Sequence, residues 1–257
     1  MKNIMFVLEK KTRIQSKKFL QLLIIFILVG QIISCFKKKN ISLEESALVV
    51  VDLQTGRNPG NLINTDTIPK ASELNIPKEW ADAGVNAEDV IKAMEFGRDH
   101  ALPNSIEAVK YFRDKKRPII YIRWGSSIQN ALDMEPTVRK YHVMMLGVDP
   151  SKWGLDNIVV DARLTSVAPG IEVVKTAHDA FISSNIDFVL KNLNIKTIFL
   201  IGGHTNACYL TTAQSAKKKG YTIVSLEDAT TDAVESRRLK GIEKAKFDYV
   251  IKTEELT

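Results

Sequence analysis

The chain has 257 residues, 45% hydrophobic and 26% charged, which is enough for one domain with a sizeable core. Its formal net charge of +6 comes from the N-terminus, where nine Lys or Arg side chains and one acid, Glu9, precede residue 40. The remainder has no basic, aromatic-rich stretch, so we expect no nucleic-acid partner, and two cysteines, Cys35 and Cys208, are too few for a disulfide framework or a cysteine-rich metal site.

The first 34 residues have the layout of a signal peptide. Residues 1–18 are rich in positive charge, and residues 19–34 are uncharged and mostly apolar. The sequence Ile-Ile-Ser-Cys at residues 32–35 resembles a relaxed lipobox of a bacterial lipoprotein signal. This resemblance implies cleavage before Cys35, lipidation of Cys35 and a tether over residues 35–45, which would anchor the protein in the bacterial cell envelope. The alternative is an uncleaved signal anchor, and both interpretations place the domain at a membrane.

A continuous apolar run over residues 47–51 predicts a buried strand that ends at Asp52. Open α/β sheets place their ligands at the carboxyl ends of strands, so Asp52 is a candidate catalytic residue. Residues 56–77 are rich in Pro, Gly, Asn and Thr and predict a long irregular loop. The loop lies next to Asp52 in the sequence, so it could shape the choice of substrate.

Helical and extended patterns alternate through the rest of the chain. We expect helices at residues 86–96 and 104–115, both with Asn caps, and at 136–145, 184–193 and 234–247, and strands at 118–124, 169–175, 222–226 and 249–252. This alternation predicts a three-layer α/β/α domain over residues 46–257, with a mainly parallel, Rossmann-like sheet.

Residues 197–213 form the most informative segment. An apolar strand pattern at 198–201 breaks on two glycines, and helical spacing begins at Thr205, which places Cys208 in the first turn of a helix. The positive end of the helix dipole there favours a thiolate, the form of cysteine that attacks electrophiles. Cys208 is therefore a candidate nucleophile, although a lone cysteine can equally be a small packed apolar residue.

Asp52, Lys175 and Cys208 each stand at or just after a predicted strand end. In that order, the three residues resemble the isochorismatase-like cysteine hydrolases, which include nicotinamidases and N-carbamoylsarcosine amidases. The motifs that carry this resemblance are VVVDLQ at the first strand, VVK with an aromatic residue six positions later, GG-x-T-x-x-C, a Thr-Ala pair after the cysteine, and Lys-Gly-Tyr before VSLEDA.

The resemblance implies a catalytic triad at the carboxyl edge of the sheet. It also implies a cis peptide bond between Gly203 and His204 and an oxyanion hole made by the backbone N–H groups of His204 and Cys208. From the residue types, Asp52 can take the thiol proton, Lys175 favours both ionised forms, and Cys208 can form a thioester. We therefore expect hydrolysis of a carbon–nitrogen bond, amide or ureido, in a small molecule.

Metal and cofactor requirements can also be judged from the sequence. The nicotinamidase branch carries a D-x-H metal motif shortly after its second strand, but residues 123–127 here contain no histidine. The four histidines, His100, His142, His178 and His204, lie far apart in the sequence. We therefore expect no catalytic metal and no cofactor.

Candidate pocket residues are Gln54, Trp124, His178 and Phe181, each of which could instead be a packing residue. Two alternatives to the amidase remain open: a non-catalytic envelope lipoprotein that keeps the fold as a binding module and, among enzymes, a nicotinamidase. A homo-oligomer is compatible with the sequence.

Overall fold

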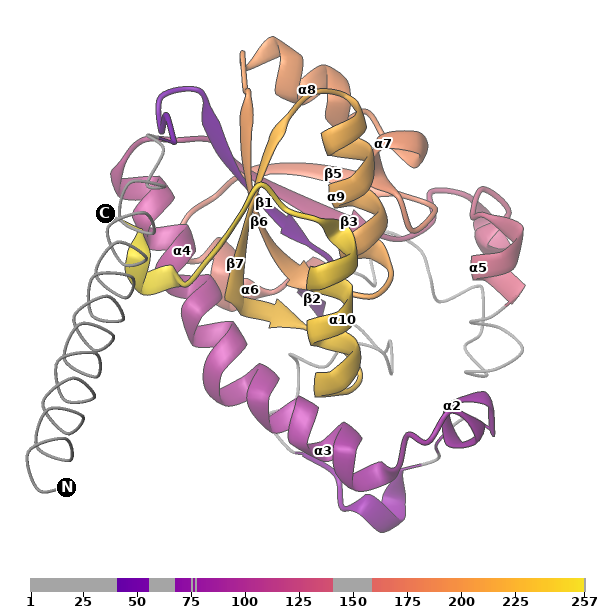
Figure 1. Ribbon diagram of the computed structural model, residues 1–257. Coiled ribbons are helices and arrows are strands. Elements are labelled where there is room, and N and C mark those ends of the chain that lie inside the picture. The colour runs from indigo at the N-terminus through magenta and orange to yellow at the C-terminus, as the bar shows by residue number, and fades with distance from the viewer. Residues whose placement is uncertain (1–40, 56–67, 75, 77, 141–158, 257) are drawn as a thin grey trace, which may run out of the picture. The chain divides into compact units, whose positions relative to one another are not determined.

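Six parallel strands form the central sheet, in the order β5-β3-β1-β6-β7-β8 (Figure 1). The computed structural model describes residues 41–55, 68–74, 76, 78–140 and 159–256. The strands are β1 (Ser46–Val51), β3 (Ile119–Trp124), β5 (Ile171–Lys175), β6 (Thr197–Gly203), β7 (Thr222–Thr231) and β8 (Tyr249–Ile251). The predicted fold class is confirmed.

The central strand β1 is buried along its whole length because helices cover both faces of the sheet. Ala47, Val49 and Val51 belong to the core cluster on one face, and the alternating Leu48 and Val50 are equally buried. A strand enclosed on both sides needs apolar side chains at every position, which explains the unbroken apolar run in the sequence.

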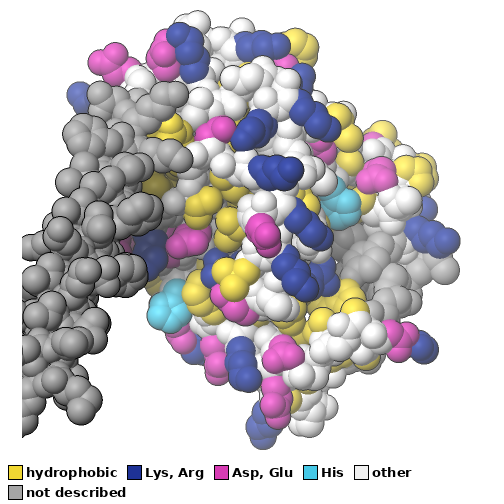
Figure 2. Space-filling view, in the orientation of Figure 1, with side chains coloured by type: hydrophobic (Ala, Val, Ile, Leu, Met, Phe, Trp, Pro, Cys, Tyr) yellow, Lys and Arg dark blue, Asp and Glu magenta, His cyan; other side chains and the backbone are white. Residues whose placement is uncertain are grey.

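One face of the sheet is covered by the helices of the C-terminal half. They are α7 (Ala180–Ser183), α8 (Ile186–Asn192), α9 (Cys208–Lys218) and α10 (Glu235–Ala245). Tyr209 and Ala213 of α9 pack in the same core cluster as Leu200 of β6. Basic side chains gather on the outer surface of α9 and α10 (Figure 2), where Lys217, Lys218, Lys240 and Lys244 are exposed.

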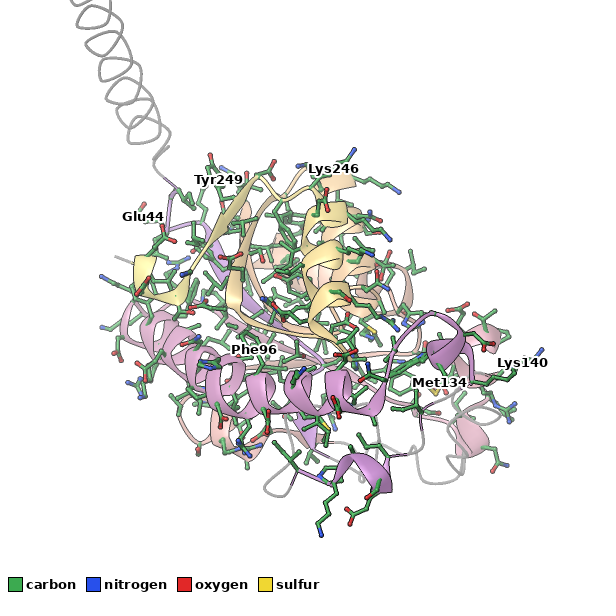
Figure 3. The ribbon with its side chains drawn as sticks, turned by 60° about the horizontal axis from the view of Figure 1, so that its bottom comes forward. Glu44, Phe96, Met134, Lys140, Lys246 and Tyr249 are labelled. Carbon is green, nitrogen blue, oxygen red and sulfur yellow. The ribbon has the colours of Figure 1, made fainter. Side chains whose placement is uncertain are left out.

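The opposite face is covered by one long helical path, made of α3 (Ala87–Phe96), a π-helical turn η2 (Gly97–Ala101) and α4 (Leu102–Asp114). Figure 3 shows this path running past Phe96. Phe112 of α4 meets Phe199 of β6 edge to face, with ring centroids 5.1 Å apart. The short helix α6 (Ala162–Thr165) lies beside α4.

Of the two Asn caps expected from the sequence, one is present and one is not. Asn86 caps α3 and accepts a 2.9 Å hydrogen bond from the Asp89 N–H. Asn104 is not a cap, because η2 keeps helical backbone angles at both ends and carries the helix straight through. The Asn104 side chain instead donates a 3.0 Å hydrogen bond to the Asp228 carbonyl, which ties α4 to β7.

The short elements lie around these layers. β2 (Gln54–Thr55) pairs antiparallel with β4 (Val159–Val160), and the remaining helices are η1 (Ala71–Glu73), α2 (Lys78–Asp82), η3 (Gln129–Ala131), α5 (Pro136–Lys140) and η7 (Thr253–Glu255). The predicted signal peptide, Cys35, His142 and most of the 56–77 loop lie outside the described residues. Within the described part of the chain, no helix is long and apolar enough to cross a membrane.

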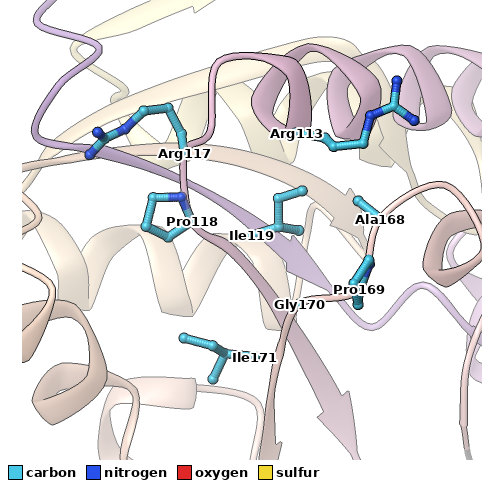
Figure 4. A pocket seen from close by; sticks show the side chains of 8 residues that line it. All are labelled: Arg113, Arg117, Pro118, Ile119, Ala168, Pro169, Gly170 and Ile171. Carbon is cyan, nitrogen blue, oxygen red and sulfur yellow. The ribbon is translucent and has the colours of Figure 1, made fainter.

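A shallow groove of about 470 Å³ lies where β3 and β5 begin (Figure 4). Arg113, Arg117 and Ile171 are among the residues that line it. Because parallel strands end at the opposite edge of the sheet, this groove is separate from the edge that carries Asp52 and Lys175.

Candidate active site

Three elements bring the predicted triad together. Asp52 directly follows β1, Lys175 is the last residue of β5, and Cys208 is the first residue of α9. The strands β1 and β5 both pair with β3, so their carboxyl ends lie at one edge of the sheet. Asp52 has a φ of 54°, in the left-handed region that non-glycine residues seldom occupy and that is frequent at functional sites.

Lys175 is the centre of this group and is fully buried. Its Nζ lies 2.9 Å from Asp52 Oδ2, 3.2 Å from Cys208 Sγ and 3.1 Å from the Ala177 carbonyl oxygen. These three contacts match the three hydrogens of an ammonium group. Asp52 Oδ1 has no hydrogen-bond partner among the described residues.

The charges of the triad follow from these contacts. Burial lowers the pKa of Lys175, but the charges and hydrogen bonds of Asp52 and Cys208 together outweigh it, so the pKa is raised overall and the side chain stays an ammonium. Burial raises the pKa of the Cys208 thiol to about 12; the charge of Lys175 opposes this rise, and the charge of Asp52 adds to it. Lys175 is therefore an ammonium at rest, and Cys208 is a protonated thiol.

The protonated thiol corrects one expectation from the sequence. A position in the first turn of a helix favours a thiolate, and Cys208 does occupy the first residue of α9. Its side chain is buried in the core cluster with Tyr209 and Ala213, however, and the loss of solvation outweighs the helix end. The thiol must therefore give its proton to a neighbour before it can attack.

His178 reaches Cys208 from the loop between β5 (Ile171–Lys175) and α7 (Ala180–Ser183). Its Nδ1 lies 3.3 Å from Cys208 Sγ. Burial lowers the pKa of His178, and the positive charge of Lys175 lowers it further, so the imidazole is neutral at pH 7. His178 is thus a candidate pocket residue whose side chain lies at hydrogen-bond distance from the sulfur.

The turn between β6 and α9 positions Cys208. The peptide bond between Gly203 and His204 is cis, at the position that the family resemblance implies. The N–H groups of Ala207 and Tyr209, on either side of Cys208, donate to the His204 carbonyl at 3.0 and 3.2 Å. These two hydrogen bonds bend the backbone tightly on both sides of Cys208.

Two buried side chains hold this turn and were not identified from the sequence. Asp232, just past β7, accepts hydrogen bonds from Thr205 Oγ1 at 3.1 Å and from the Asn206 N–H at 2.7 Å. The Tyr209 hydroxyl donates to the Leu200 carbonyl at 3.0 Å, which fastens the start of α9 to β6.

Neither residue had a clear signal in the sequence. Asp232 would have been a strand-end candidate if the predicted strand had not stopped at residue 226, where Glu227 and Asp228 interrupt the apolar pattern. The sequence pattern places Tyr209 at an apolar position of a helix and gives no sign of its hydroxyl hydrogen bond.

The oxyanion hole remains a prediction. The Cys208 N–H belongs to the first turn of α9, whose N–H groups have no partner within the helix. The His204 side chain lies close to the same turn, with Nδ1 3.9 Å from Asp232 Oδ1.

The other candidate pocket residues have structural contacts. Gln54 donates to the Trp124 carbonyl at 2.9 Å and accepts from the Trp124 N–H at 2.8 Å, so its amide links two strand ends. The Trp124 ring lies 5.9 Å from Lys175 Nζ and borders the triad. Phe181 is buried in the core and tilts against Tyr221, with centroids 5.8 Å apart, so it supports α7.

Metal-binding side chains are not gathered in the part of the chain that the structure describes. No three His, Cys, Asp or Glu residues come together there in a way that could hold a metal ion.

The fold and these contacts define an α/β protein with a buried Asp–Lys–Cys group at the carboxyl edge of a parallel sheet. The chain belongs to the isochorismatase family, because residues 46–255 match the family's isochorismatase domain. The family resemblance predicted from the motifs is thereby confirmed. A sequence comparison with curated proteins finds no match.

Solved structures share this fold at low sequence identity. An isochorismatase family protein from Burkholderia thailandensis is 19% identical with a TM-score of 0.56, covering 83% of this chain and 94% of its own. A cysteine hydrolase from Pseudomonas syringae pv. phaseolicola is 17% identical with a TM-score of 0.59, covering 84% and 92%. N-carbamoylsarcosine amidase from Thermoplasma acidophilum is 20% identical with a TM-score of 0.53, covering 82% and 98%.

Proposed function

We propose that this protein hydrolyses a carbon–nitrogen bond, amide or ureido, of a small molecule through a thioester on Cys208. The observation that carries the proposal is the position of Lys175 Nζ, 2.9 Å from Asp52 Oδ2 and 3.2 Å from Cys208 Sγ in a buried site. A buried ammonium that joins a carboxylate to a thiol is costly to maintain for stability alone, and such arrangements concentrate at active sites.

The chemistry follows from the three residues. The thiol loses its proton, the sulfur attacks the carbonyl carbon, and the negative charge that develops on the carbonyl oxygen needs N–H donors nearby. We place the backbone N–H groups of His204 and Cys208 in that role. Asp52 is the general acid and base of the cycle, and its Oδ1, which has no hydrogen-bond partner among the described residues, suits the water that cleaves the thioester.

The family and one fold neighbour agree with this choice of bond. The Thermoplasma acidophilum neighbour is an N-carbamoylsarcosine amidase, which by its name acts on a carbon–nitrogen bond. The nicotinamidase alternative is less well supported, since residues 123–127 lack the histidine of that branch's metal motif.

The test is a hydrolysis screen over small amides, ureas and ureido acids, with nicotinamide included and ammonia release as the readout. We expect turnover of at least one compound by the full chain and none by Cys208→Ala. If no compound is turned over and Cys208 shows the reactivity of an ordinary cysteine, the non-catalytic binding module becomes the better description.

We further propose that Cys35 carries the lipid that anchors the domain in the cell envelope. The support is the order of charge, apolar stretch and cysteine in residues 1–35. Diacylglycerol on Cys35, with Lys37, Lys38 and Lys39 near anionic headgroups, would give stable anchoring. Mass spectrometry of membrane-extracted protein beside Cys35→Ala tests it: a native chain that begins at Met1 would leave the signal anchor as the explanation.

A further inference from the structure

The edge of the sheet opposite the catalytic one concentrates positive charge. Because the six strands are parallel, all of them begin at this amino edge, together with the turns that lead into them. We call the charged segments there the basic edge: residues 44–45, 113–117, 187–196, 217–219 and 243–248. They contain eleven Lys or Arg and six Asp or Glu side chains, a formal charge of +5, although residues 40–257 as a whole contain 27 and 29, a charge of −2. The domain is therefore polarised, and the rest of it is acidic.

Hydrogen bonds join the basic edge into one surface. The Arg117 guanidinium donates to the Glu44 carbonyl, and Lys196 Nζ lies 2.6 Å from Glu45 Oε1. The Lys196 carbonyl accepts a 2.9 Å hydrogen bond from the Thr222 N–H. The surface thus runs without a break from the start of β3 past β1 and β6 to the start of β7.

The surface continues to β8, and part of its charge is not neutralised within the protein. Lys217 Nζ donates to the Lys246 carbonyl at 2.6 Å and to Asp248 Oδ1 at 2.9 Å. Lys116, Lys218 and Lys246 are exposed and have no carboxylate partner among the described residues. These three ammonium groups are available to an anion outside the protein.

The groove of about 470 Å³ lies in the same edge, where β3 and β5 begin (Figure 4). Arg113 and Arg117 line it together with the apolar side chains of Pro118, Pro169 and Ile171. Guanidinium groups bind phosphate oxygens through paired hydrogen bonds. A recess with cationic and apolar lining suits the phosphate of a phospholipid together with the apolar part below it.

The N-terminal tether enters the domain at the middle of this edge. Ser46, the first residue of the central strand β1, donates to the Leu43 carbonyl from its N–H at 3.2 Å and from its hydroxyl at 2.7 Å. Leu43 is eight residues after Cys35, a span of at most about 30 Å when fully extended. An anchor at or before Cys35 therefore holds the amino edge close to the bilayer surface.

We propose that the basic edge is a membrane-docking surface that binds the phosphate headgroups of an anionic phospholipid bilayer. The inference rests on the membrane anchor proposed above, and a lipid or an uncleaved signal anchor serves it equally. Charge complementarity favours this occupant, because Lys and Arg clusters within about 10 Å of an anionic membrane are attracted to it at moderate salt. Docking in this way turns Asp52, Lys175 and Cys208 toward the aqueous side, where a water-soluble amide can reach them.

Lysine footprinting on vesicles tests this without knowledge of the substrate. The full chain is reconstituted into phosphatidylcholine vesicles with or without about 30% phosphatidylglycerol and treated with a membrane-impermeant acylating reagent. Mass spectrometry then quantifies the modification of each lysine. We expect Lys116, Lys218 and Lys246 to react at least about fivefold more slowly on the anionic vesicles, and about 0.5 M NaCl to remove this protection. Lys92 and Lys140 are exposed on α3 and α5, which meet the carboxyl ends of β7 and β5, and should react equally on both.

A pair of charge-matched variants shows whether the basic edge itself causes the protection. Lys116→Gln, Lys218→Gln and Lys246→Gln are combined, and the exposed Lys196 then reports on docking and should lose its protection. The control removes the same charge from exposed positions outside the basic edge: Lys70→Gln, Lys92→Gln and Lys140→Gln. In the control variant Lys196 should stay protected, and ammonia release in the hydrolysis assay should be unchanged in both variants.

The outcomes separate docking from the anchor. Equal acylation of the basic edge on both kinds of vesicle would overturn the inference and leave the anchor standing. Sedimentation with neither kind would overturn both, whereas sedimentation with anionic vesicles alone, reversed by salt, would keep the docking surface and remove the anchor. Protection by inorganic phosphate at the same phosphate concentration, without vesicles, would assign the edge to a soluble anion and overturn the inference.

Discussion

The carboxylate of Asp232 accepts a 2.7 Å hydrogen bond from the backbone N–H of Asn206, two residues before Cys208. Its second oxygen accepts a hydrogen bond of the same length from the Ala233 N–H. Asp232 is buried, so both carboxylate oxygens accept hydrogen bonds from groups inside the protein. The end of β7 thereby fixes the turn between β6 and α9, although it contributes no atom to the triad.

Asp232→Asn tests this role. The new amide has one acceptor where the carboxylate has two, so an NH₂ group must face either the Asn206 or the Ala233 N–H. Leaving a buried donor unsatisfied costs about 1–3 kcal/mol in the free energy of unfolding, measurable by urea denaturation. Iodoacetamide labelling of Cys208 should change as well, because the turn would shift. The exposed Asp82→Asn is the control and should stay within about 0.5 kcal/mol of wild type.

Lys175→Met keeps much of the aliphatic stem and removes the charge. The ammonium lowers the pKa of Cys208, so its loss should raise that pKa further and slow labelling of the thiol. Ammonia release in the hydrolysis assay should fall by about 10² or more, as when one electrostatic partner of an acyl-transfer site is lost. Lys191→Met, which removes a surface partner of Asp187, should behave as wild type. Full activity in Lys175→Met would show that Lys175 is not the third member of the triad.

Asp52→Asn should separate ionisation of the thiol from turnover. The negative charge of Asp52 raises the pKa of Cys208, so removing it should lower that pKa and make the thiolate easier to form. Amide hydrolysis should nevertheless fall by about 10²–10⁴, because the base for the attacking water is gone. Parallel titration of labelling and ammonia release measures both effects, with the exposed Glu88→Gln as control. If the rate of Cys208 labelling and the rate of ammonia release rise or fall together, Asp52 acts on the thiol alone.

Much of this architecture is encoded locally. Residues 47–51 form an unbroken apolar run because β1 is buried on both faces, and the polar residue after such a run must lie at an edge of the sheet. The same reasoning applied to Lys175, together with the helix signal after Gly203, predicts that Asp52, Lys175 and Cys208 lie close together. The helix α9 begins at Cys208, three residues later than the expected start at Thr205, because residues 204–207 form the turn that precedes it.

Other features depend on contacts that no local pattern encodes. The contact between His178 and Cys208 arises because Asp179 and Ala180 dock on α9, through side chains spaced 30 residues or more away. The protonation state of Cys208 is hidden from the sequence for the same reason: a helix start is visible there, but the burial that raises the pKa of the thiol is not. The length of β7 was hidden by Glu227 and Asp228, whose contacts lie with Arg238 and Thr253.

The last prediction concerns the pH dependence of stability and needs no substrate. The pKa of His178 is lowered from 6.5 in the folded protein, so between the lowered value and 6.5 the unfolded chain binds more protons than the folded one. Stability from this residue is therefore complete above pH 6.5 and is lost as the pH falls toward the folded-state pKa.

His178→Asn cannot titrate, so its free energy of unfolding should fall less steeply on acidification below pH 6.5. The difference in slope approaches about 1.4 kcal/mol per pH unit, the value for one proton. Urea denaturation at several pH values below 6.5 measures both slopes, with His100→Asn as the matched histidine-to-asparagine control at an exposed position. Equal slopes in wild type and His178→Asn would mean that His178 titrates normally in the folded protein.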